Sequence, residues 1–318
     1  MKETGRPGLV ILTGPTAVGK SELSIMLAKQ IGGEIISADS MQVYRNMDIG
    51  SAKIMPEEME QIPHHLIDVL EPTEEFNVVS FQTLAQKALE GIYERGHIPI
   101  VVGGTGFYIQ ALLYEIDFTE NDEDRELRKQ LEEIATSQGS EVLYKRLRSI
   151  DPESCETIHA HNQKRIIRAI EFYEKTGRKI SEHNKEQRSR RSPYDFAYFV
   201  LNDDREQIYC RIDQRVDKML AHGLVEEVLS LARAGCTRDM VSMQGLGYKE
   251  ILDYLDHKIT LEEAVYTLKR DTRHFAKRQL TWFRRERDVI WIDKQDFGYD
   301  KQRMIDHMLE ILRKKGIL

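Results

Sequence analysis

The chain has 318 residues, a formal net charge of -7 at pH 7, and 41% hydrophobic and 31% charged residues. This composition excludes a disordered chain, and the negative charge argues against a uniformly basic nucleic-acid binder while still allowing local basic patches. Because the chain is longer than one ordinary hydrophobic core, we expect a main domain with an insertion or appendage.

The cysteines and the N-terminus indicate the cellular compartment. Cys155, Cys210 and Cys236 lie far apart, with no C-x-x-C pair and no zinc-like spacing. We expect them to be reduced thiols. The first residues lack the apolar segment of a signal peptide, and no apolar run is long enough to span a bilayer. We therefore expect a cytoplasmic protein that does not associate with membranes.

The most informative local pattern is GPTAVGKS at Gly14–Ser21, which matches G-x-x-x-x-G-K-[ST]. It lies between the apolar run Leu9–Leu12, predicted to be a buried strand, and Ser21–Ile31, which has helical spacing of its leucines. In such a loop, backbone N–H groups at the positive end of a helix dipole surround an anion. The lysine adds a charge, and Ser21 can coordinate Mg²⁺. The pattern predicts a di- or triphosphate site without specifying the compound.

Strand and helix patterns alternate after this loop. The predicted strands cover residues 34–38, 65–70 and 98–102, and residues 79–93 are predicted to form a helix. This alternation predicts an α/β fold with a P-loop NTPase-like parallel sheet and helices on both faces. Ligands bind at the carboxyl ends of such strands. We therefore expect the phosphate loop, Asp39 and Gly103–Thr105 to share one edge of the sheet.

The middle of the chain has a different pattern. After the acidic, turn-prone residues 120–124, helical spacing continues from residue 125 to about residue 185, and residues 196–201 return to a strand pattern. We expect an all-helical insertion domain at residues 118–194, within a P-loop core formed by residues 1–117 and 195–318. Later elements are predicted as helices at 205–234, 260–287 and 303–315 and a strand at 289–292.

The phosphate loop alone leaves two ATP-dependent functions open, a small-molecule or nucleotide kinase and a nucleic-acid-binding ATPase. Mg²⁺-dependent NTP hydrolases usually carry a second acidic residue at the end of an apolar strand. The strand at 98–102 is followed by glycines instead, although Asp39 and Asp68 also follow predicted strands and remain eligible. A kinase is therefore possible from the loop but is not supported elsewhere.

Several separated blocks resemble the tRNA dimethylallyltransferase family, also called tRNA isopentenyltransferases. They are GPTAVGKSELS, IISADSMQVYRNMDIGSAK, PHHLIDVLEP, VVGGTGFYIQALLYEIDF and SMQGLGYKE, within about Leu9 to Arg287. The resemblance implies that the chain moves a dimethylallyl group from dimethylallyl pyrophosphate to N6 of the adenosine 3′ of the anticodon in tRNA. The phosphate loop would then hold pyrophosphate, not ATP. Without the Cys/His set of a zinc-finger tail, the chain resembles the bacterial form, and no obligate protein partner is evident.

The resemblance also implies roles for individual residues, with Asp39 as the general base. The residues implied at the reacting centre are Asp39, Thr16, Lys20, Thr105, Arg211 and Arg215. The residues implied to bind pyrophosphate are Gly14, Pro15, Thr16, Ala17, Val18, Gly19, Lys20 and Ser21. The residues implied to contact tRNA are Asp39, Ser40, Met41, Gln42, Thr105, Arg128, Gln163, Lys164, Arg165, Arg168, Gln244, Gly247, Lys277, Arg278, Gln279 and Trp282.

Some of these assignments have a plainer structural alternative. An aspartate at a strand end, such as Asp39, often only caps the following turn or helix. Lys164, Arg165 and Arg168 match the solvated face of an amphipathic helix equally well. The arginine-rich stretch 269–287 is harder to explain this way. Like charges repel unless an anion faces them, and the interleaved aromatic residues offer stacking surfaces for unpaired bases.

Overall fold

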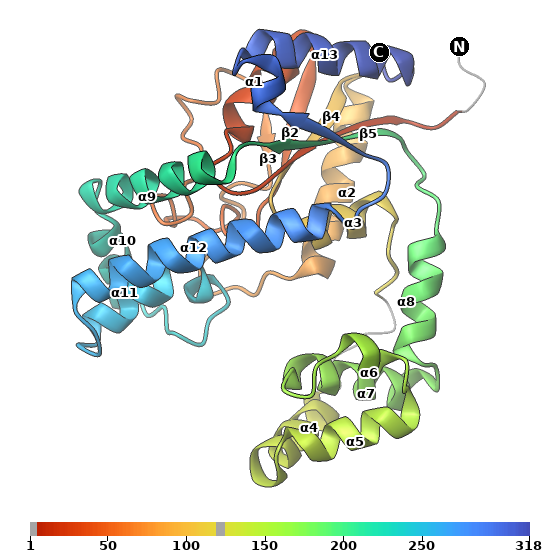
Figure 1. Ribbon diagram of the computed structural model, residues 1–318, viewed down its shortest axis with the longest axis vertical. Helices are drawn as coiled ribbons and strands as arrows, with labels where there is room; N and C mark the ends of the chain where they lie inside the picture. Colours follow the sequence, from red (N-terminus) through yellow and green to blue (C-terminus); the bar gives the residue numbers. More distant parts are fainter. Residues whose placement is uncertain (1–4, 119–124) are drawn as a thin grey trace. The chain divides into compact units, whose positions relative to one another are not determined.

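The computed structural model describes residues 5–118 and 125–318 (Figure 1). The chain forms two compact units, one made of Met1–Leu113 with Pro193–Leu318 and the other of Tyr114–Ser192. The boundaries predicted from the sequence followed residues 117 and 194. The predicted acidic turn at 120–124 lies outside the described residues.

The first unit is built on a sheet of six parallel strands in the order β3-β2-β4-β1-β5-β6. The strands are β1 (Gly8–Thr13), β2 (Gly33–Ala38), β3 (His64–His65), β4 (Ile98–Gly103), β5 (Asp195–Asn202) and β6 (Val289–Asp293). This arrangement confirms the predicted α/β class with a parallel sheet. Because β4 lies between β1 and β2, the strand that Asp39 directly follows is the next but one from the phosphate-loop strand.

Helices cover both faces of this sheet. The helices of the first unit are α1 (Lys20–Ile31), α2 (Val78–Glu94), α3 (Gly106–Leu113), α9 (Arg205–Ala221), α10 (Leu224–Arg233), α11 (Tyr248–Leu255), α12 (Leu261–Phe283) and α13 (Lys301–Lys314), with short 3-10 helices at Ser242–Gln244 and Lys294–Phe297. Figure 1 shows α1 and α13 packed together, and their apolar side chains form one core with Val10, Leu12 and Phe199. The alternate side chains Leu9 and Ile11 are also buried, and α2 packs against β2 and β4. Burial on both faces explains the continuous apolar runs of these strands.

Some predicted elements differ from the structure. The predicted strand at 65–70 is wrong, because β3 ends at His65. Leu66 has φ 64° and Asp68 has φ 53°. These left-handed backbone conformations cannot continue a strand. The predicted helix at 205–234 is two helices, since the chain turns at Gly223 with φ 99°. Helices α3 and α11 were not predicted.

The second unit contains helices and no strand within its described residues. They are α4 (Arg125–Gln138), α5 (Ser140–Ile150), α6 (Ser154–Thr157), α7 (Gln163–Thr176) and α8 (Ile180–Ser189). Leu131, Leu147 and Ile166 belong to a core shared by α4, α5 and α7. The buried carboxylate of Asp151 accepts hydrogen bonds from backbone and side-chain groups of Ser154 and Ser181, and so connects α6 to α8.

None of the helices in the described parts of the chain has both the length and the apolar composition that a bilayer span requires.

Candidate active site

The phosphate loop curls between β1 and α1, in the context that the sequence predicted. Gly14 has φ 146°, and a Cβ there would lie 2.3 Å from the carbonyl oxygen of Leu201. Gly19 has φ 99° and precedes the first residue of α1. Only glycine fits two such positions without strain. The free N–H groups and the positive dipole end of α1 therefore begin directly after the loop, as an anion site requires.

Three cationic side chains hold the carbonyl oxygens of this loop. The bonds run from Lys20 Nζ to Gly14 O (3.0 Å) and Pro15 O (2.9 Å), from Arg211 Nε to Ala17 O (2.9 Å) and from Lys294 Nζ to Val18 O (3.3 Å). The cations thus lie against the loop itself, within reach of an anion bound there. One backbone N–H of the loop, that of Thr16, donates a hydrogen bond to Gln279 Oε1 at 2.9 Å.

Positive charge exceeds negative charge around the loop. The cations at the loop are Lys20, Arg211, Arg215 and Lys294, and the carboxylates nearest to them are Asp39 and Asp203. Glu22 and Lys301 also act on Lys294, but they pair with each other and leave the balance unchanged. Burial, together with the like charge of Arg215, lowers the pKa of Lys20 to about 8, and the charge of Asp39 partly opposes this. Like charges held this close are favourable only when an anion neutralises them. The surplus of positive charge therefore suits an anionic ligand at the loop.

The two predicted arginines of α9 have different surroundings. Arg211 and Arg215 are four residues apart and share a helix face. Arg211 Nη2 pairs with the buried Asp203 at 2.5 Å. Arg215 Nη1 lies 3.5 Å from Thr16 Oγ1, and no carboxylate of the described residues lies within ion-pair distance of it. Burial lowers the pKa of Arg215, with Asp39 opposing. Arg215 is thus the more available of the two for an incoming anion.

Lys294 and Asp203 were missed from the sequence. Lys294 directly follows β6, and its ammonium lies 3.8 Å from Asp203, which directly follows β5. Neither residue is part of a recognisable sequence motif. The signal that could have found them is their place at the carboxyl ends of strands, where ligands of parallel sheets bind.

Asp39 follows β2 directly and uses its carboxylate in two ways. Oδ1 accepts hydrogen bonds from the backbone N–H groups of Met41 (2.8 Å) and Gln42 (3.3 Å). Oδ2 has no hydrogen-bond partner among residues 5–118 and 125–318. The charge of Asp39 acts on Lys20, Arg215 and Tyr108. The turn-cap role is therefore real, but it occupies one oxygen and leaves the other facing the cationic site.

Glycines at the end of β4 make close approach possible. A Cβ on Gly103 would lie 2.2 Å from the carbonyl oxygen of Ala38, one on Gly104 2.1 Å from Gln279 Nε2, and one on Gly106 2.2 Å from Trp282 Cδ1. Thr105 N donates to the carbonyl oxygen of Ala38 at 3.3 Å. This packing places Thr105 beside Asp39, between β2 and α12.

The segment after Asp39 is held by two charged side chains that the sequence did not indicate. The carboxylate of Glu227 accepts from the backbone N–H groups of residues 48–50 (2.7 to 3.0 Å) and from Tyr248 Oη (2.8 Å). The buried Nζ of Lys53 contacts Tyr44 O, Asp48 Oδ1 and Asp68 Oδ1 at 2.5 to 2.6 Å. Gln42 Nε2 donates to Ala52 O at 3.2 Å, so this predicted tRNA contact already makes a hydrogen bond inside the segment.

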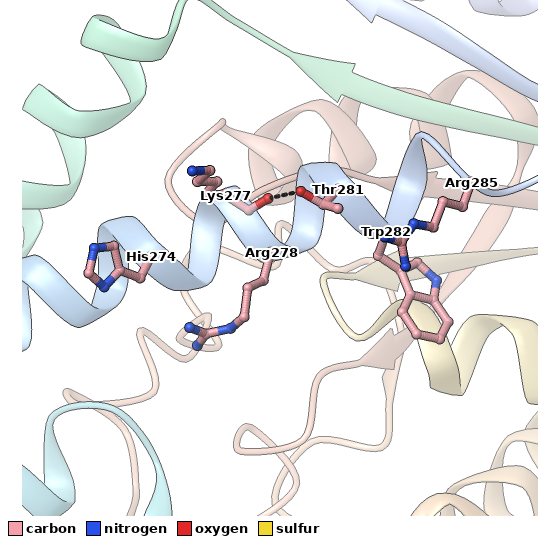
Figure 2. Close-up of a pocket in the computed structure, with 6 residues that line it drawn as sticks. All are labelled: His274, Lys277, Arg278, Thr281, Trp282 and Arg285. Carbon is pink, nitrogen blue, oxygen red and sulfur yellow. Dashed lines mark hydrogen bonds between the residues drawn. The ribbon is translucent and has the colours of Figure 1, made fainter. Parts of the chain in front are cut away.

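The outer face of α12 carries exposed cations and an aromatic ring. Figure 2 shows the six side chains that line an open hollow of about 470 Å³ on this helix, namely His274, Lys277, Arg278, Thr281, Trp282 and Arg285. The Arg278 guanidinium lies 5.8 Å from the ring centre of Phe275. Such a surface suits a phosphate backbone and unstacked bases.

Three other residues predicted to contact tRNA in this part of the chain already make hydrogen bonds within the protein. Gln279 is 6% exposed, and both ends of its amide are bonded to the phosphate loop and to Gly104, so the structure does not present it to RNA. Gly247 is buried at the start of α11, where Glu250 accepts from its N–H at 2.8 Å. Gln244 is exposed and donates to Arg238 O.

The predicted contacts in the helical unit lie on α4 and α7. Lys164, Arg165 and Arg168 are exposed, on the side of α7 opposite its buried isoleucines. Gln163 is the first residue of α7, and Arg128 Nη2 lies 3.3 Å from Glu171. This arrangement fits a solvated helix face and an RNA-binding face equally well, so these contacts stay predictions.

Ser21, the predicted Mg²⁺ ligand, could supply one ligand to the ion. The Ser21 side chain is exposed at the first turn of α1, and its hydroxyl has no partner among the described residues. No group of three His, Cys, Asp or Glu residues in the described parts of the chain could hold a metal ion. Mg²⁺ commonly takes one or two protein ligands and completes its shell with phosphate and water. A single serine at the phosphate loop is compatible with that pattern.

The fold and this edge of the sheet define a P-loop α/β protein whose loop suits an anionic phosphate compound. A family model described as IPP transferase matches residues 42–286, and one described as isopentenyl transferase matches residues 7–70. The tRNA dimethylallyltransferase of Lachnoclostridium phytofermentans is 62% identical over 310 residues, which cover 98% of this chain and 99% of that protein.

Solved structures agree with these matches. The tRNA isopentenylpyrophosphate transferase of Bacillus halodurans is 44% identical, with 98% of both chains covered and a TM-score of 0.74. A eukaryotic dimethylallyltransferase, described in crystallographic snapshots acting on tRNA, is 32% identical, with 97% of this chain and 80% of that chain covered and a TM-score of 0.83. This chain therefore belongs to the tRNA dimethylallyltransferase (isopentenyltransferase) family.

Proposed function

We propose that this enzyme transfers a dimethylallyl group from dimethylallyl pyrophosphate to N6 of the adenosine 3′ of the anticodon in tRNA. The observation that carries the proposal is the pairing of a cation-rich phosphate loop with Asp39 Oδ2, a carboxylate oxygen without a partner in the described residues. A diphosphate leaving group needs the first, and an amine that must lose a proton needs the second.

The phosphate loop binds and stabilises the leaving pyrophosphate. Negative charge accumulates on the bridging oxygen as the bond from the allylic carbon breaks. Lys20 and Arg215 are held close to this position before any substrate arrives. Cations fixed in advance stabilise developing charge without reorganising during the reaction. Mg²⁺, when held by Ser21, would neutralise part of the remaining diphosphate charge.

Asp39 orients the amine and accepts its proton. An exocyclic adenine amine is a poor nucleophile because its lone pair is delocalised into the ring, and its proton becomes acidic only as the new C–N bond forms. A carboxylate oxygen within hydrogen-bond reach can therefore act as the general base. The N6 lone pair forms the bond to the allylic carbon, the C–O bond to pyrophosphate breaks, and the N6 proton passes to Asp39 Oδ2. Oδ1 keeps its turn hydrogen bonds, so the carboxylate stays in position.

The adenine must leave its stack to reach this site. Base-modifying enzymes extrude the target base and read it in a pocket. The exposed face of α12 offers cations for the RNA backbone and Trp282 for stacking. The exposed basic residues of α7 are proposed to add further contacts to the anticodon arm. Unpaired loop bases are the usual targets of sequence-specific RNA recognition.

The kinase alternative is less well supported. The second acidic residue that would help to hold Mg²⁺ is absent after β4. Three glycines there are needed instead for close packing against Ala38, Gln279 and Trp282. The charge surplus at the loop suits pyrophosphate as well as ATP, so the two donors require a direct test.

The test offers both donors to the same enzyme. Purified protein is incubated with unmodified tRNA and either dimethylallyl pyrophosphate labelled in the prenyl group or ATP labelled in the γ-phosphate. We expect only the prenyl label to enter tRNA, at the adenosine 3′ of the anticodon after nuclease digestion. A transcript with guanosine at that position is the matched control and should stay unlabelled. Transfer of the γ-phosphate, or prenyl label in the control transcript, would overturn the proposal.

A further inference from the structure

Gln279 lies where α12 meets two loops of the site. Its Oε1 accepts from the backbone N–H of Thr16 at 2.9 Å, and its Nε2 donates to the carbonyl oxygen of Gly104 at 3.0 Å. The residue is 6% exposed. One buried side chain therefore connects the loop after β1, which holds the phosphate site, to the loop after β4, which carries Thr105.

The packing around this bridge is tight. A Cβ on Gly104 would lie 2.1 Å from Gln279 Nε2, so the amide rests directly on the glycine backbone. About one turn later on α12, the indole of Trp282 covers Gly106 in the same manner. Thr105 lies between these two contacts. Close-packed neighbours of this kind transmit displacement instead of absorbing it, so the position of α12 sets the position of Thr105.

The outer face of α12 is exposed and basic, unlike the buried face that carries Gln279. Lys277 and Arg278 directly precede Gln279 and are exposed (Figure 2). Successive residues of an α-helix point about 100° apart, so neighbours in sequence occupy different faces. The outer face of α12 is thus available to RNA while its inner face holds the two loops.

We infer that Gln279 is a positioning residue, which fixes the separation between the phosphate loop and Thr105 through the helix that faces tRNA. This inference rests on the proposed function, and it replaces the expectation that Gln279 itself contacts tRNA. A fixed separation matters because the allylic carbon held by one loop must meet an amine held beside the other. Reacting atoms need a near-attack geometry.

The experiment separates positioning from RNA contact. Gln279→Met keeps the length of the side chain and removes both hydrogen bonds. Single-turnover transfer is measured with both substrates saturating, and tRNA affinity is measured separately by fluorescence anisotropy. We expect the rate constant to fall about 10- to 100-fold while the tRNA Kd changes by less than about twofold. Misfolded enzyme lowers the amplitude of the reaction and does not change its rate constant.

Tyr266→Phe, which removes one exposed hydroxyl from the same helix, is the control and should match the wild type. If Gln279→Met does not fold, Gln279→Glu serves instead. It keeps an acceptor for Thr16 but has no N–H for Gly104, and it should also lose rate without losing tRNA affinity. Weaker tRNA binding with an unchanged rate constant, or no change in either, would overturn the positioning role. A wild-type enzyme that transfers no prenyl group would instead overturn the proposed function.

Discussion

Strand β2 has an acidic residue near each of its ends, and the two have opposite surroundings. Glu34 lies near the amino end and Asp39 directly follows the carboxyl end. The Glu34 carboxylate accepts two hydrogen bonds from Arg95 (2.7 and 2.8 Å) and lies 2.6 to 2.7 Å from ring nitrogens of His65 and His97. Its charge is fully compensated inside the protein.

Asp39 faces cations too, but its carboxylate lacks such a set of hydrogen bonds. Its Oδ1 is used by a local turn, while Oδ2 has no partner among the described residues, and the cations it faces exceed the available carboxylates. The contrast supports the proposed division between Glu34 as a structural carboxylate and Asp39 as a functional one. A group whose hydrogen bonds and charge are all satisfied by the protein stabilises the protein, and a group left incomplete is available to substrate.

The largest expected effect comes from Asp39→Asn. The asparagine oxygen can still accept from Met41 and Gln42, so folding and binding of both substrates should survive. Without a base, the single-turnover transfer rate should drop by about 10²- to 10⁴-fold. A wild-type rate in a folded Asp39→Asn variant would reduce Asp39 to a turn cap and remove the contrast with Glu34.

Glu34→Gln should show the reverse pattern. The amide cannot accept both Arg95 hydrogen bonds and both histidines, so we expect the free energy of unfolding to fall by about 2–3 kcal/mol, with no change in the transfer rate constant. Denaturant unfolding and single-turnover kinetics measure the two quantities. A slower transfer step in a fully folded Glu34→Gln enzyme would contradict the assignment of Glu34 to stability alone.

The same carboxylate predicts an acid-dependent loss of stability. The hydrogen bonds from Arg95, with smaller contributions from the two histidines, lower the pKa of Glu34 to about 2 from an ordinary value of 4.5. A carboxyl with a depressed folded pKa stabilises the protein above its unfolded pKa. This contribution, on the order of 3 kcal/mol, should be lost as pH falls from about 4.5 toward 2, and Glu34→Gln should lack this part of the pH dependence.

Capture of the prenyl donor should depend on the protonation of Lys20. The pKa of Lys20 is lowered to about 8, so its charge is present below that pH and is lost above it. We expect kcat/KM for dimethylallyl pyrophosphate to fall about tenfold per pH unit above this value. Lys20→Arg stays charged and should remove this decline, even though its absolute activity is lower. A decline that persists in Lys20→Arg would assign it to another group.

The smallest effect is expected in the helical unit. If Arg165 and Arg168 contact tRNA phosphates, replacing each by Gln should flatten the dependence of log Kd on log salt by about one unit. Arg146→Gln, whose guanidinium already pairs with Glu174 at 2.8 Å, is the matched control and should leave the slope unchanged. Unchanged slopes for both α7 variants would make these arginines a solvated helix face.

Most of the secondary structure of the first unit was predictable because its signals are local. The apolar runs of β1, β2, β4 and β5 and the glycines of the phosphate loop encode strand and turn directly. The failures have local causes too. Leu66 and Asp68 adopt left-handed backbone conformations inside an apolar run, and nothing in their identity required this. Helix α3 follows a glycine-rich segment that resembled a loop.

The sequence by itself determined the phosphate loop, the place of Asp39 at a strand end and the basic character of α12, since each depends on residues close together in the chain. Only the tertiary structure decided which groups complete the site. Lys294, Glu227 and Gln279 reach it from distant elements. Their hydrogen bonds to Val18, to residues 48–50 and to Gly104 join residues 175 to 276 positions apart. The physical reason is that charge compensation and burial are properties of three-dimensional neighbours. Gln279 becomes a bridge, and one oxygen of Asp39 is left without a partner among the described residues, only when the chain has folded around them.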